Sequence, residues 1–236
     1  MLEALQAGVP TDVVYVMAGI DSDDRIREII GQCRSKRLQL LEVSRTDLDR
    51  MTSEMSHQGV AARIPAYTYR ETEDLLHGGS TLVVALDSVT DPRNLGAVIR
   101  SAAAFGATGV LIPQRRAAGV TASAWKTSAG AAARIPVAQA TNLVRALKEC
   151  QEAGCFVIGL AGDGSQSLAE AAQEFFDGPA VIVVGSEGEG LSRLVRQTCD
   201  VIVRIDIDSA TESLNASVAT SIALYEAAKV RKAAGR

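Results

Sequence analysis

Short apolar runs alternate with helical segments along most of this 236-residue chain, and this alternation limits its possible folds more than any other feature. The clearest run is Leu82–Asp87 (LVVALD), which is apolar up to its last residue, as expected for a strand covered on both faces. Between such runs the apolar residues have helical spacing, for example Ile26, Ile29, Ile30 and Cys33. Strands separated by helices predict an α/β fold, in which a parallel sheet carries helices on both faces.

The same patterns predict elements on both sides of a polar stretch. Before it, we expect helices at Leu2–Ala7, Asp23–Arg34 and 45–51, the last capped by Ser44, and strands at Val13–Met17, Leu38–Val43 and Gly59–Ile64. After it, we expect strands at Leu82–Asp87, Gly109–Ile112, Ile135–Val137, Cys155–Leu160, Ala180–Val184 and Val201–Arg204. The helices expected there are Leu95–Phe105, Ala122–Ala133 in part, Asn142–Ala153, Leu191–Gln197 and Leu214–Lys232.

The polar stretch Pro65–Gly79 contains a proline and ends in Gly-Gly, which is typical of a connection between domains. We therefore predict a small α/β domain at residues 1–65, a linker at 66–79 and a larger domain at 80–236. The formal net charge is −4, and residues 1–79 hold 9 Lys and Arg against 13 Asp and Glu. The whole deficit thus lies in the first third, and a simple basic protein that coats nucleic acid is disfavoured.

Several other classes of protein are disfavoured by what the sequence lacks. It has no run of about 18 apolar residues, so we expect no transmembrane helix. The first residues include Glu3 and no basic region, unlike a secretory signal. The four cysteines form no CxxC pair and lie at no metal-ligand spacing from the two histidines. We therefore expect no metal site, and reduced, mostly buried thiols in a cytoplasmic protein.

Three segments carry the residues best suited to chemistry, and each follows a predicted strand. In open parallel sheets, ligands bind beyond the carboxyl ends of the strands. The first segment, Asp87–Arg100, passes through a proline-containing turn into a helix, with Asn94 near the start of that helix and Arg100 further along it. Taken alone, this segment is equally well a turn with an N-capping asparagine and a solvated arginine.

The second segment, Val181–Leu191, places three glycines after an apolar strand, so its main chain turns tightly and approaches a neighbour closely. It looks like a dinucleotide-binding glycine loop. However, Glu187 and Glu189 would repel a pyrophosphate, and the segment lies late in the chain. A ligand that is positively charged and lacks phosphates fits better.

The third segment, Ile205–Ala219, leads from a strand through a polar loop into the long C-terminal helix, for which Ser213 is the expected N-cap. In isolation this segment is a capped terminal helix. Its alanines and serines also suit close packing between helices, as in a subunit interface.

Taken together, the patterns D-P-x-N-x-G-x-x-x-R, V-G-S-E-G-x-G and S-L-N-x-S-V-A resemble, in order and spacing, the three signature motifs of the SpoU/TrmH branch of the SPOUT RNA methyltransferases. The resemblance covers roughly residues 80–232. The N-terminal third, with MLEALQAG, VVYV and HQGV, resembles the ribosomal-protein-like RNA-binding domain of the 23S rRNA guanosine 2'-O-methyltransferase subgroup (RlmB-like). The chain departs from many relatives at Ile205-Asp206-Ile207, where they read Ile-Pro-Met.

This resemblance implies a fold and a reaction. The reaction is transfer of a methyl group from S-adenosylmethionine to a ribose 2'-hydroxyl, with a guanosine of the large-subunit rRNA as the implied substrate. The implied fold of the larger domain is a SPOUT domain with a deep C-terminal trefoil knot, whose threaded part begins near Ile205. Members of the family are homodimers with each active site near the subunit interface.

The resemblance also implies roles for particular residues. The implied cofactor contacts are Gly185, Gly188, Ile205 and Leu214. The implied catalytic residues are Arg100, Asn94, Glu187, Ser213 and Asn215. The family assigns Arg100 the removal of the hydroxyl proton, helped by an RNA phosphate. A guanidinium has a pKa above about 12 and resists deprotonation, so the alternative is that Arg100 anchors the phosphate while water takes the proton.

Binding of RNA by an acidic protein requires local clusters of basic residues. Arg115 and Arg116, directly after a predicted strand, are the preferred RNA contacts. Further candidates, each of which is otherwise an ordinary solvated patch, are Arg34, Lys36, Arg37, Lys126, Lys229, Arg231 and Lys232. The aromatic content of 4% argues against a platform of aromatic side chains that stack on bases.

Alternative functions remain open at this point. A tRNA ribose methyltransferase is the nearest, although the N-terminal domain favours rRNA, and an adenosine-specific enzyme like the thiostrepton-resistance methyltransferases is related. A non-catalytic RNA-binding module would require degenerate motifs. A nicotinamide-dependent oxidoreductase is disfavoured by the acidic loop.

Overall fold

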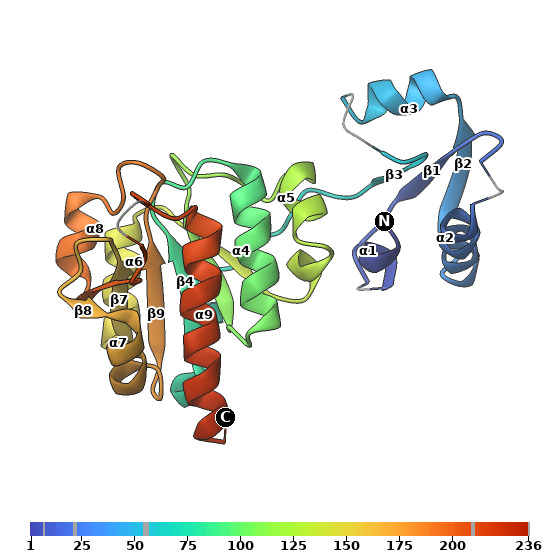
Figure 1. Ribbon diagram of the computed structural model, residues 1–236. Coiled ribbons are helices and arrows are strands. Elements are labelled where there is room, and N and C mark those ends of the chain that lie inside the picture. The colour runs from blue at the N-terminus through green and yellow to red at the C-terminus, as the bar shows by residue number, and fades with distance from the viewer. Residues whose placement is uncertain (7, 21–22, 54–56, 209–210, 236) are drawn as a thin grey trace. The chain divides into compact units, whose positions relative to one another are not determined.

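The computed structural model describes residues 1–6, 8–20, 23–53, 57–208 and 211–235. The chain forms two compact units, Met1–Tyr67 and Thr68–Arg236, whose elements are labelled in Figure 1. Each unit is described by itself below. No described helix is both long and apolar enough to cross a membrane.

The first unit is a small sheet with three helices. Its elements are α1 (Leu2–Gln6), β1 (Val13–Met17), α2 (Asp24–Ser35), β2 (Gln39–Val43), α3 (Arg45–Met51) and β3 (Val60–Arg63). Strand β1 is central, parallel to β2 and antiparallel to β3. The predicted elements are confirmed with ends shifted by a residue, except that Ala7 lies outside the described residues. Ser44 caps α3 as predicted, because its side chain accepts a hydrogen bond from the Asp47 amide.

The second unit is a larger α/β structure. Its strands are β4 (Leu82–Leu86), β5 (Gly109–Pro113), β6 (Val137–Ala140), β7 (Phe156–Leu160), β8 (Gln166–Ser167), β9 (Ala180–Val184) and β10 (Val201–Arg204). Its α-helices are α4 (Pro92–Ala104), α5 (Ala122–Thr127), α6 (Leu143–Glu152), α7 (Leu168–Phe175), α8 (Arg193–Thr198) and α9 (Ala216–Ala233). Short 3-10 helices cover η1 (Thr72–Leu75), η2 (Gly78–Ser80) and η3 (Ala131–Ala133).

The seven strands form one parallel sheet in the order β6-β5-β4-β9-β7-β10-β8. The predicted α/β class and parallel sheet are therefore confirmed. Strand β9 lies between β4 and β7. In sequence, 93 residues lie between Leu86, the last residue of β4, and Ala180, the first residue of β9. The trefoil knot implied by the resemblance stays a prediction.

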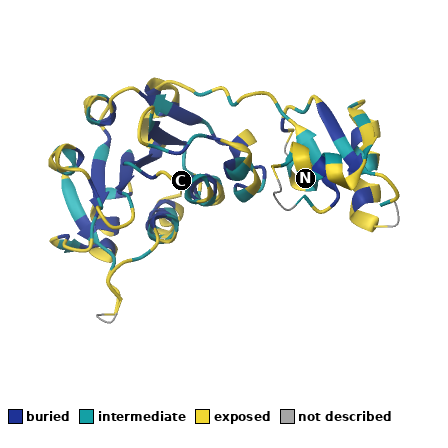
Figure 2. Ribbon diagram, turned by 90° about the horizontal axis from the view of Figure 1, so that it is seen from above, coloured by how far each residue is buried: buried dark blue, intermediate teal, exposed yellow. Residues whose placement is uncertain are grey.

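Helices cover both faces of this sheet, which explains why its central strands are continuously apolar. Alternate strand residues such as Val83 and Val183 join a core cluster with Leu147 of α6 and Val195 of α8. Helices α4, α7 and α9 pack on the opposite side, where the red α9 runs beside the green α4 in Figure 1. Figure 2 shows most of the central part of the sheet in dark blue, since both faces of the central strands β4, β5, β7 and β9 are buried.

The structure corrects the predicted linker at 66–79. Arg70 forms a bridge to Ala138 beside β6, and Leu75 of η1 is fully buried in the core of the second unit. Most of this stretch therefore belongs to the second unit, which begins at Thr68. Its polar composition hid the apolar Leu75, whose buried side chain helps to anchor the segment.

Three further differences concern helix and strand limits. Helix α7 is absent from the predicted elements because it is rich in alanine, although its capping box, Ser167 with Glu170, is a readable signal. The strand expected at 135–137 begins at Val137. Helices α4 and α9 start at residues other than those predicted, with consequences for the site described below.

Arg231, near the end of α9, is a structural residue and not the exposed RNA contact that its neighbours in sequence suggested. It is 7% exposed, and its guanidinium donates hydrogen bonds to the carbonyl oxygens of Phe176, Ser80, Thr81 and Gly178 at 2.6–3.1 Å. These carbonyls lie in turns next to the amino ends of β4 and β9. The arginine therefore fastens the C-terminal helix to the sheet.

Replacing Arg231 tests this anchoring role. We expect Arg231→Ala to lower the free energy of unfolding by about 3 kcal/mol or more, because several buried carbonyl groups lose their donor. The neighbouring exposed Lys232 is the control, and Lys232→Ala should change stability by less than about 0.5 kcal/mol. Urea denaturation followed by circular dichroism measures both, and equal effects of the two substitutions would contradict the assignment.

Candidate active site

The carboxyl ends of the four neighbouring strands β4, β9, β7 and β10 form one edge of the sheet. The first predicted segment follows β4, the second follows β9 and the third follows β10. Since the strands are parallel and adjacent, segments that are far apart in sequence meet at this edge. Residues 209–210 of the third segment lie outside the described residues.

In the first segment, helix α4 begins earlier than the sequence suggested. Asp91 is the N-cap and Pro92 is the first helical residue, an order that suits the fixed φ of proline. Asn94 is therefore in the first helical turn, where its side chain is free to bond outside the helix. Helices α4 and α5 pack closely at Gly96. A Cβ at this position would lie 2.5 Å from the Ala124 carbonyl oxygen, so a larger residue does not fit there.

The second segment folds back on itself directly after β9. The main chains of Ser186 and Gly190 exchange two hydrogen bonds of 3.1 and 3.0 Å, which close the loop. A Cβ on Gly185 would lie 2.1 Å from the Gly190 carbonyl carbon, and Gly188 has a φ of +89°. The glycines are thus required by the tightness of this turn, as the sequence predicts.

In the third segment, the N-cap of α9 is Asn215 and not Ser213. The Asn215 Oδ1 atom accepts hydrogen bonds from the amides of Ser217 at 2.9 Å and Val218 at 3.3 Å. Ser213 is exposed and makes no hydrogen bond within the described part of the chain. Capping by Asn215 leaves its Nδ2 group pointing away from the helix, available for another partner.

The three segments are joined by side-chain hydrogen bonds at a single carboxylate. Glu187 Oε1 accepts from Asn94 Nδ2 at 2.9 Å and from Asn215 Nδ2 at 2.5 Å. The Asn215 amide also lies 3.1 Å from Asn94 Oδ1. We call Asn94, Glu187 and Asn215 the amide–carboxylate triad. All three were predicted site residues, and the structure brings them together.

A cavity of about 570 Å³ opens beside the triad. The predicted cofactor contacts Gly185, Gly188, Ile205 and Leu214 all line it, as do Glu187 and Ser213. Its other lining residues are Leu160, Ala161, Gly162, Asp163, Val184, Ser186, Glu189, Gly190, Leu191, Arg196, Ile207, Glu212, Ala216 and Ala219. Both main chain and side chains thus form its wall.

The charge of the cavity is negative. Four carboxylates line it, from Asp163, Glu187, Glu189 and Glu212, against the single guanidinium of Arg196. Arg196 is already paired, because it donates two hydrogen bonds to Asp163 at 2.9 and 3.1 Å. This pairing lowers the pKa of Asp163 from its ordinary value. The cavity therefore suits a small cationic ligand without phosphates, as the two loop glutamates suggested.

Sequence reasoning missed the wall contributed by the loop after β7. Leu160, Gly162 and Asp163 line the cavity, and this loop also follows a strand at the carboxyl edge. The strand-end rule that selected the other three segments applies here too, and the nearby glycines were a readable signal.

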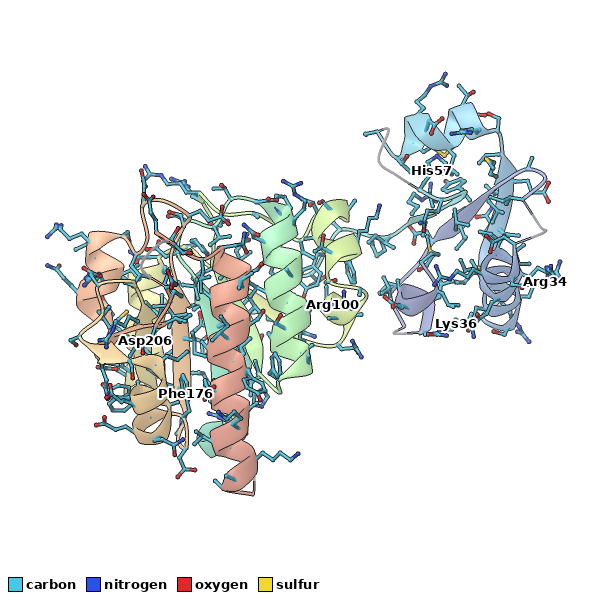
Figure 3. The ribbon with its side chains drawn as sticks, in the orientation of Figure 1. Arg34, Lys36, His57, Arg100, Phe176 and Asp206 are labelled. Atoms are coloured by element: carbon cyan, nitrogen blue, oxygen red, sulfur yellow. The ribbon has the colours of Figure 1, made fainter. Side chains whose placement is uncertain are left out.

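Three predicted arginines do not line this cavity. Arg100, labelled in Figure 3, is on α4 with its side chain exposed, and it makes no hydrogen bond or ion pair among the described residues. Six residues along a helix correspond to about 9 Å and to a different face, so Asn94 and Arg100 point in different directions. Arg115 and Arg116, after β5, are also exposed.

The charge of Asp206, at the position where many relatives carry proline, is compensated locally. Its carboxylate pairs with Arg204 at 3.0 Å, and Arg204 also donates to the carbonyl oxygens of Gly164 and Ser165. Figure 3 labels Asp206 in this region of the second unit. The segment after β10 is thus tied to the loop after β7 by side-chain contacts in place of a proline ring.

Comparison with known proteins agrees with this class of site, a ligand cavity at the carboxyl edge of a parallel sheet. Residues 81–225 match the SpoU rRNA Methylase family, and residues 1–70 match a domain described as RNA 2'-O ribose methyltransferase substrate binding. An uncharacterized tRNA/rRNA methyltransferase of Mycobacterium ulcerans is 52% identical over 238 residues, 98% of this chain and 75% of the relative. The chain belongs to the SpoU family of RNA methyltransferases.

Solved structures show the same fold. The SpoU methyltransferase AviRb from Streptomyces viridochromogenes, in complex with the cofactor AdoMet, has a TM-score of 0.79 at 25% identity, covering 98% of this chain and 87% of its own. An AdoMet-bound rRNA methyltransferase from Sinorhizobium meliloti has a TM-score of 0.78 at 24% identity, covering 97% and 83%. Both likenesses extend over nearly the whole chain.

The corrected helix cap can be tested by a pair of substitutions. We expect Asn215→Ala to lower the free energy of unfolding by about 1–2 kcal/mol, because α9 loses its N-cap. Ser213→Ala, at the N-cap position suggested by sequence, should change it by less than about 0.5 kcal/mol. Urea denaturation of both variants decides, and a larger loss for Ser213→Ala would show that the cap is misassigned.

Proposed function

We propose that this protein transfers a methyl group from S-adenosylmethionine to the ribose 2'-hydroxyl of a guanosine in 23S rRNA. The observation that carries the proposal is the amide–carboxylate triad at the mouth of an acidic cavity, assembled from the three segments whose motifs resemble those of the SpoU family. Membership of that family supports the class of reaction.

The residues of the cavity fit this cofactor. S-Adenosylmethionine carries a sulfonium cation and no phosphate, which suits a wall of four carboxylates whose one arginine is already paired. The Gly185–Gly190 contact leaves no space for a side chain, so the main chain itself forms that part of the wall. The AdoMet-bound structures of two relatives support the same assignment.

When bound, the cofactor supplies a methyl group on a sulfonium, and its transfer to the ribose oxygen leaves a neutral thioether. The contribution of the protein is mainly position, because the attacking oxygen must lie in line with the bond that breaks. Asn94 and Asn215 hold the Glu187 carboxylate through two hydrogen bonds and leave its second oxygen, Oε2, without a partner in the described residues. That oxygen is available to orient a hydroxyl or a cation. Ser213, exposed in the cavity wall, is a further contact for the substrate ribose.

Arg100 is proposed as the residue that anchors an RNA phosphate next to the reacting ribose. Its exposed guanidinium makes no competing ion pair in the described residues, and its planar set of donors suits phosphate. Because a guanidinium keeps its proton, we assign Arg100 to binding and to stabilising developing charge, with loss of the hydroxyl proton to water.

The first unit and the basic residues after β5 are proposed to bind the RNA. Residues 1–70 match the substrate-binding domain of RNA 2'-O ribose methyltransferases. Arg115 and Arg116 are exposed and carry no ion pair in the described residues. In contrast, Lys36 donates a hydrogen bond to the Leu5 carbonyl oxygen, and Lys229 pairs with Glu226. These two lysines are therefore weaker candidates.

We further propose that the protein is a cytoplasmic homodimer. The outer face of α9 exposes Val218 at 45% and Tyr225 at 52%, and these side chains line a shallow apolar hollow together with Ile222. Large exposed apolar side chains on one helix face are typical of a subunit contact. Four free cysteines, three of them buried, support a reducing compartment.

A tRNA ribose or an rRNA adenosine as substrate is the second candidate. The description of the Mycobacterium ulcerans relative, tRNA/rRNA methyltransferase, names both classes of RNA. The description of the family matched by residues 81–225, SpoU rRNA Methylase, and the rRNA methyltransferase of Sinorhizobium meliloti with the same fold favour rRNA.

Mass-spectrometric mapping of 2'-O-methyl groups in rRNA and tRNA tests the function. A strain without the gene should lose methylation of one 23S rRNA guanosine, and the wild-type gene should restore it. An unchanged rRNA map, or loss of a methyl group from tRNA alone, would contradict the proposed substrate.

In the same strain, we expect Arg100→Ala to restore less than about one hundredth of the wild-type methylation rate, because the phosphate that positions the reacting ribose loses its anchor. Arg145→Ala, which removes an exposed arginine of α6 paired with Glu149, is the control and should restore methylation fully. Near-normal methylation by Arg100→Ala would refute its role.

The negative charge of Glu187 should favour binding of the cationic S-adenosylmethionine over the neutral product that remains after methyl transfer. Glu187→Gln keeps an oxygen acceptor for both asparagines but removes the negative charge, so it should weaken S-adenosylmethionine about tenfold and S-adenosylhomocysteine, a neutral thioether, much less. Glu189→Gln, in the same loop but without a hydrogen bond in the described residues, is the matched control with a smaller effect. Isothermal titration calorimetry measures the affinities of the wild type and both variants for the two ligands, and equal losses for the two ligands in Glu187→Gln would contradict a charge contact at Glu187.

A further inference from the structure

Asp87 is a buried carboxylate that the proposed chemistry does not use. It directly follows β4, at the carboxyl edge of the sheet, and is only 5% exposed. It does not line the cavity and forms no ion pair in the described part of the chain. Burial of a carboxylate without a cationic partner is costly, so the hydrogen bonds that Asp87 makes must compensate.

These hydrogen bonds hold the two residues that flank loop 185–191, which is the part of the second segment after β9. The Asp87 amide donates to the Val184 carbonyl oxygen at 2.8 Å, immediately before the loop 185–191. The Asp87 Oδ2 atom accepts from the Ser192 amide at 2.6 Å, immediately after the loop. The remaining oxygen, Oδ1, accepts from the Ser88 hydroxyl at 3.2 Å. Asp87, directly after β4, therefore closes the base of the loop that carries Glu187.

The tip of the loop is held by the hydrogen bonds that Asn94 and Asn215 donate to Glu187, whereas its base depends on Asp87. Among the described residues, its internal closure is the pair of main-chain bonds between Ser186 and Gly190, and Glu187, Gly188 and Glu189 are exposed. Ser192 is the N-cap of α8, and the acceptor for its amide is the Asp87 carboxylate. A short bond to an ionised acceptor is stronger than one between neutral groups. The hydrogen bonds of Asp87 to Val184 and Ser192 therefore fix the positions of both ends of the loop relative to the sheet.

We propose that Asp87 is a positioning residue, which clasps both ends of loop 185–191 and so preforms the cavity wall and the orientation of Glu187. Its effect on cofactor affinity rests on the proposed function, whereas its effect on the loop does not. The competing interpretation is that Asp87 stabilises the whole second unit without any particular effect on the loop.

Hydrogen exchange of the intact chain without any ligand tests the clasp directly. In Asp87→Ala, the amides of Ser192 and Gly190 should exchange at least about tenfold faster, while the amides of β4 and β9 keep their protection. Asp87→Asn retains an oxygen acceptor and should restore most of the loop protection.

Asp200, at the amino-terminal ends of the strands, provides a matched control. There the Asp200 carboxylate accepts from the Val157 amide at 2.7 Å, which is likewise a bond between a carboxylate and a main-chain amide. Asp200→Ala should therefore leave exchange in loop 185–191 unchanged. Should Asp87→Ala fail to fold, Ser192→Pro serves instead, because it deletes the donor at a residue whose φ of −61° proline adopts.

Calorimetry with S-adenosylmethionine adds the functional readout. We expect Asp87→Ala or Ser192→Pro to weaken binding about tenfold to a hundredfold, the range for loss of a hydrogen bond to a charged group, with Asp87→Asn close to wild type. If the wild-type chain binds no S-adenosylmethionine, the proposed cofactor is wrong, and the exchange data still decide the clasp. Unchanged loop exchange, or equal acceleration over the whole second unit, would overturn the proposal.

Discussion

The geometry of the site depends on one carboxylate oxygen, Glu187 Oε1, which accepts hydrogen bonds from Asn94 and Asn215. Through it, a helix after β4, a loop after β9 and a helix after β10 are held in one arrangement. Each partner has its own support, because Asn94 is in the first turn of α4 and Asn215 caps α9. Side chains that are already fixed lose little entropy when they bond, so the triad costs less to order than three free side chains would.

This arrangement is possible only because the parallel sheet brings distant segments to one edge. Strand β9 lies between β4 and β7, and the segments that follow β7, β9 and β10 form the cavity wall. At the other end, Arg231 fastens α9 to the amino ends of the strands through main-chain carbonyls. The negative wall then selects the type of ligand, since four carboxylates around one paired arginine favour a cation over a phosphate.

Much of this could be predicted from the sequence. The continuous apolar runs indicated the parallel sheet, and the residue types in three segments indicated the site, because strand ends meet at one edge whatever their separation in sequence. Contacts that depend on the exact start of a helix could not be predicted: Ser213 resembled an N-cap, and only the chain path shows that Asn215 has this role. The buried states of Leu75 and Arg231 were likewise hidden, since a single anchoring side chain leaves no periodic pattern.

The central claim is that the acidic cavity beside the amide–carboxylate triad holds the methyl donor. A crystal structure of the chain with S-adenosylmethionine, with the sulfur located by anomalous scattering, tests it most directly. The account predicts the sulfur inside the cavity lined by Gly185 and Leu214, with its methyl group directed towards Glu187 and Asn94. A cofactor bound elsewhere on the chain, or bound in the cavity with its sulfonium turned away from the triad, would contradict it.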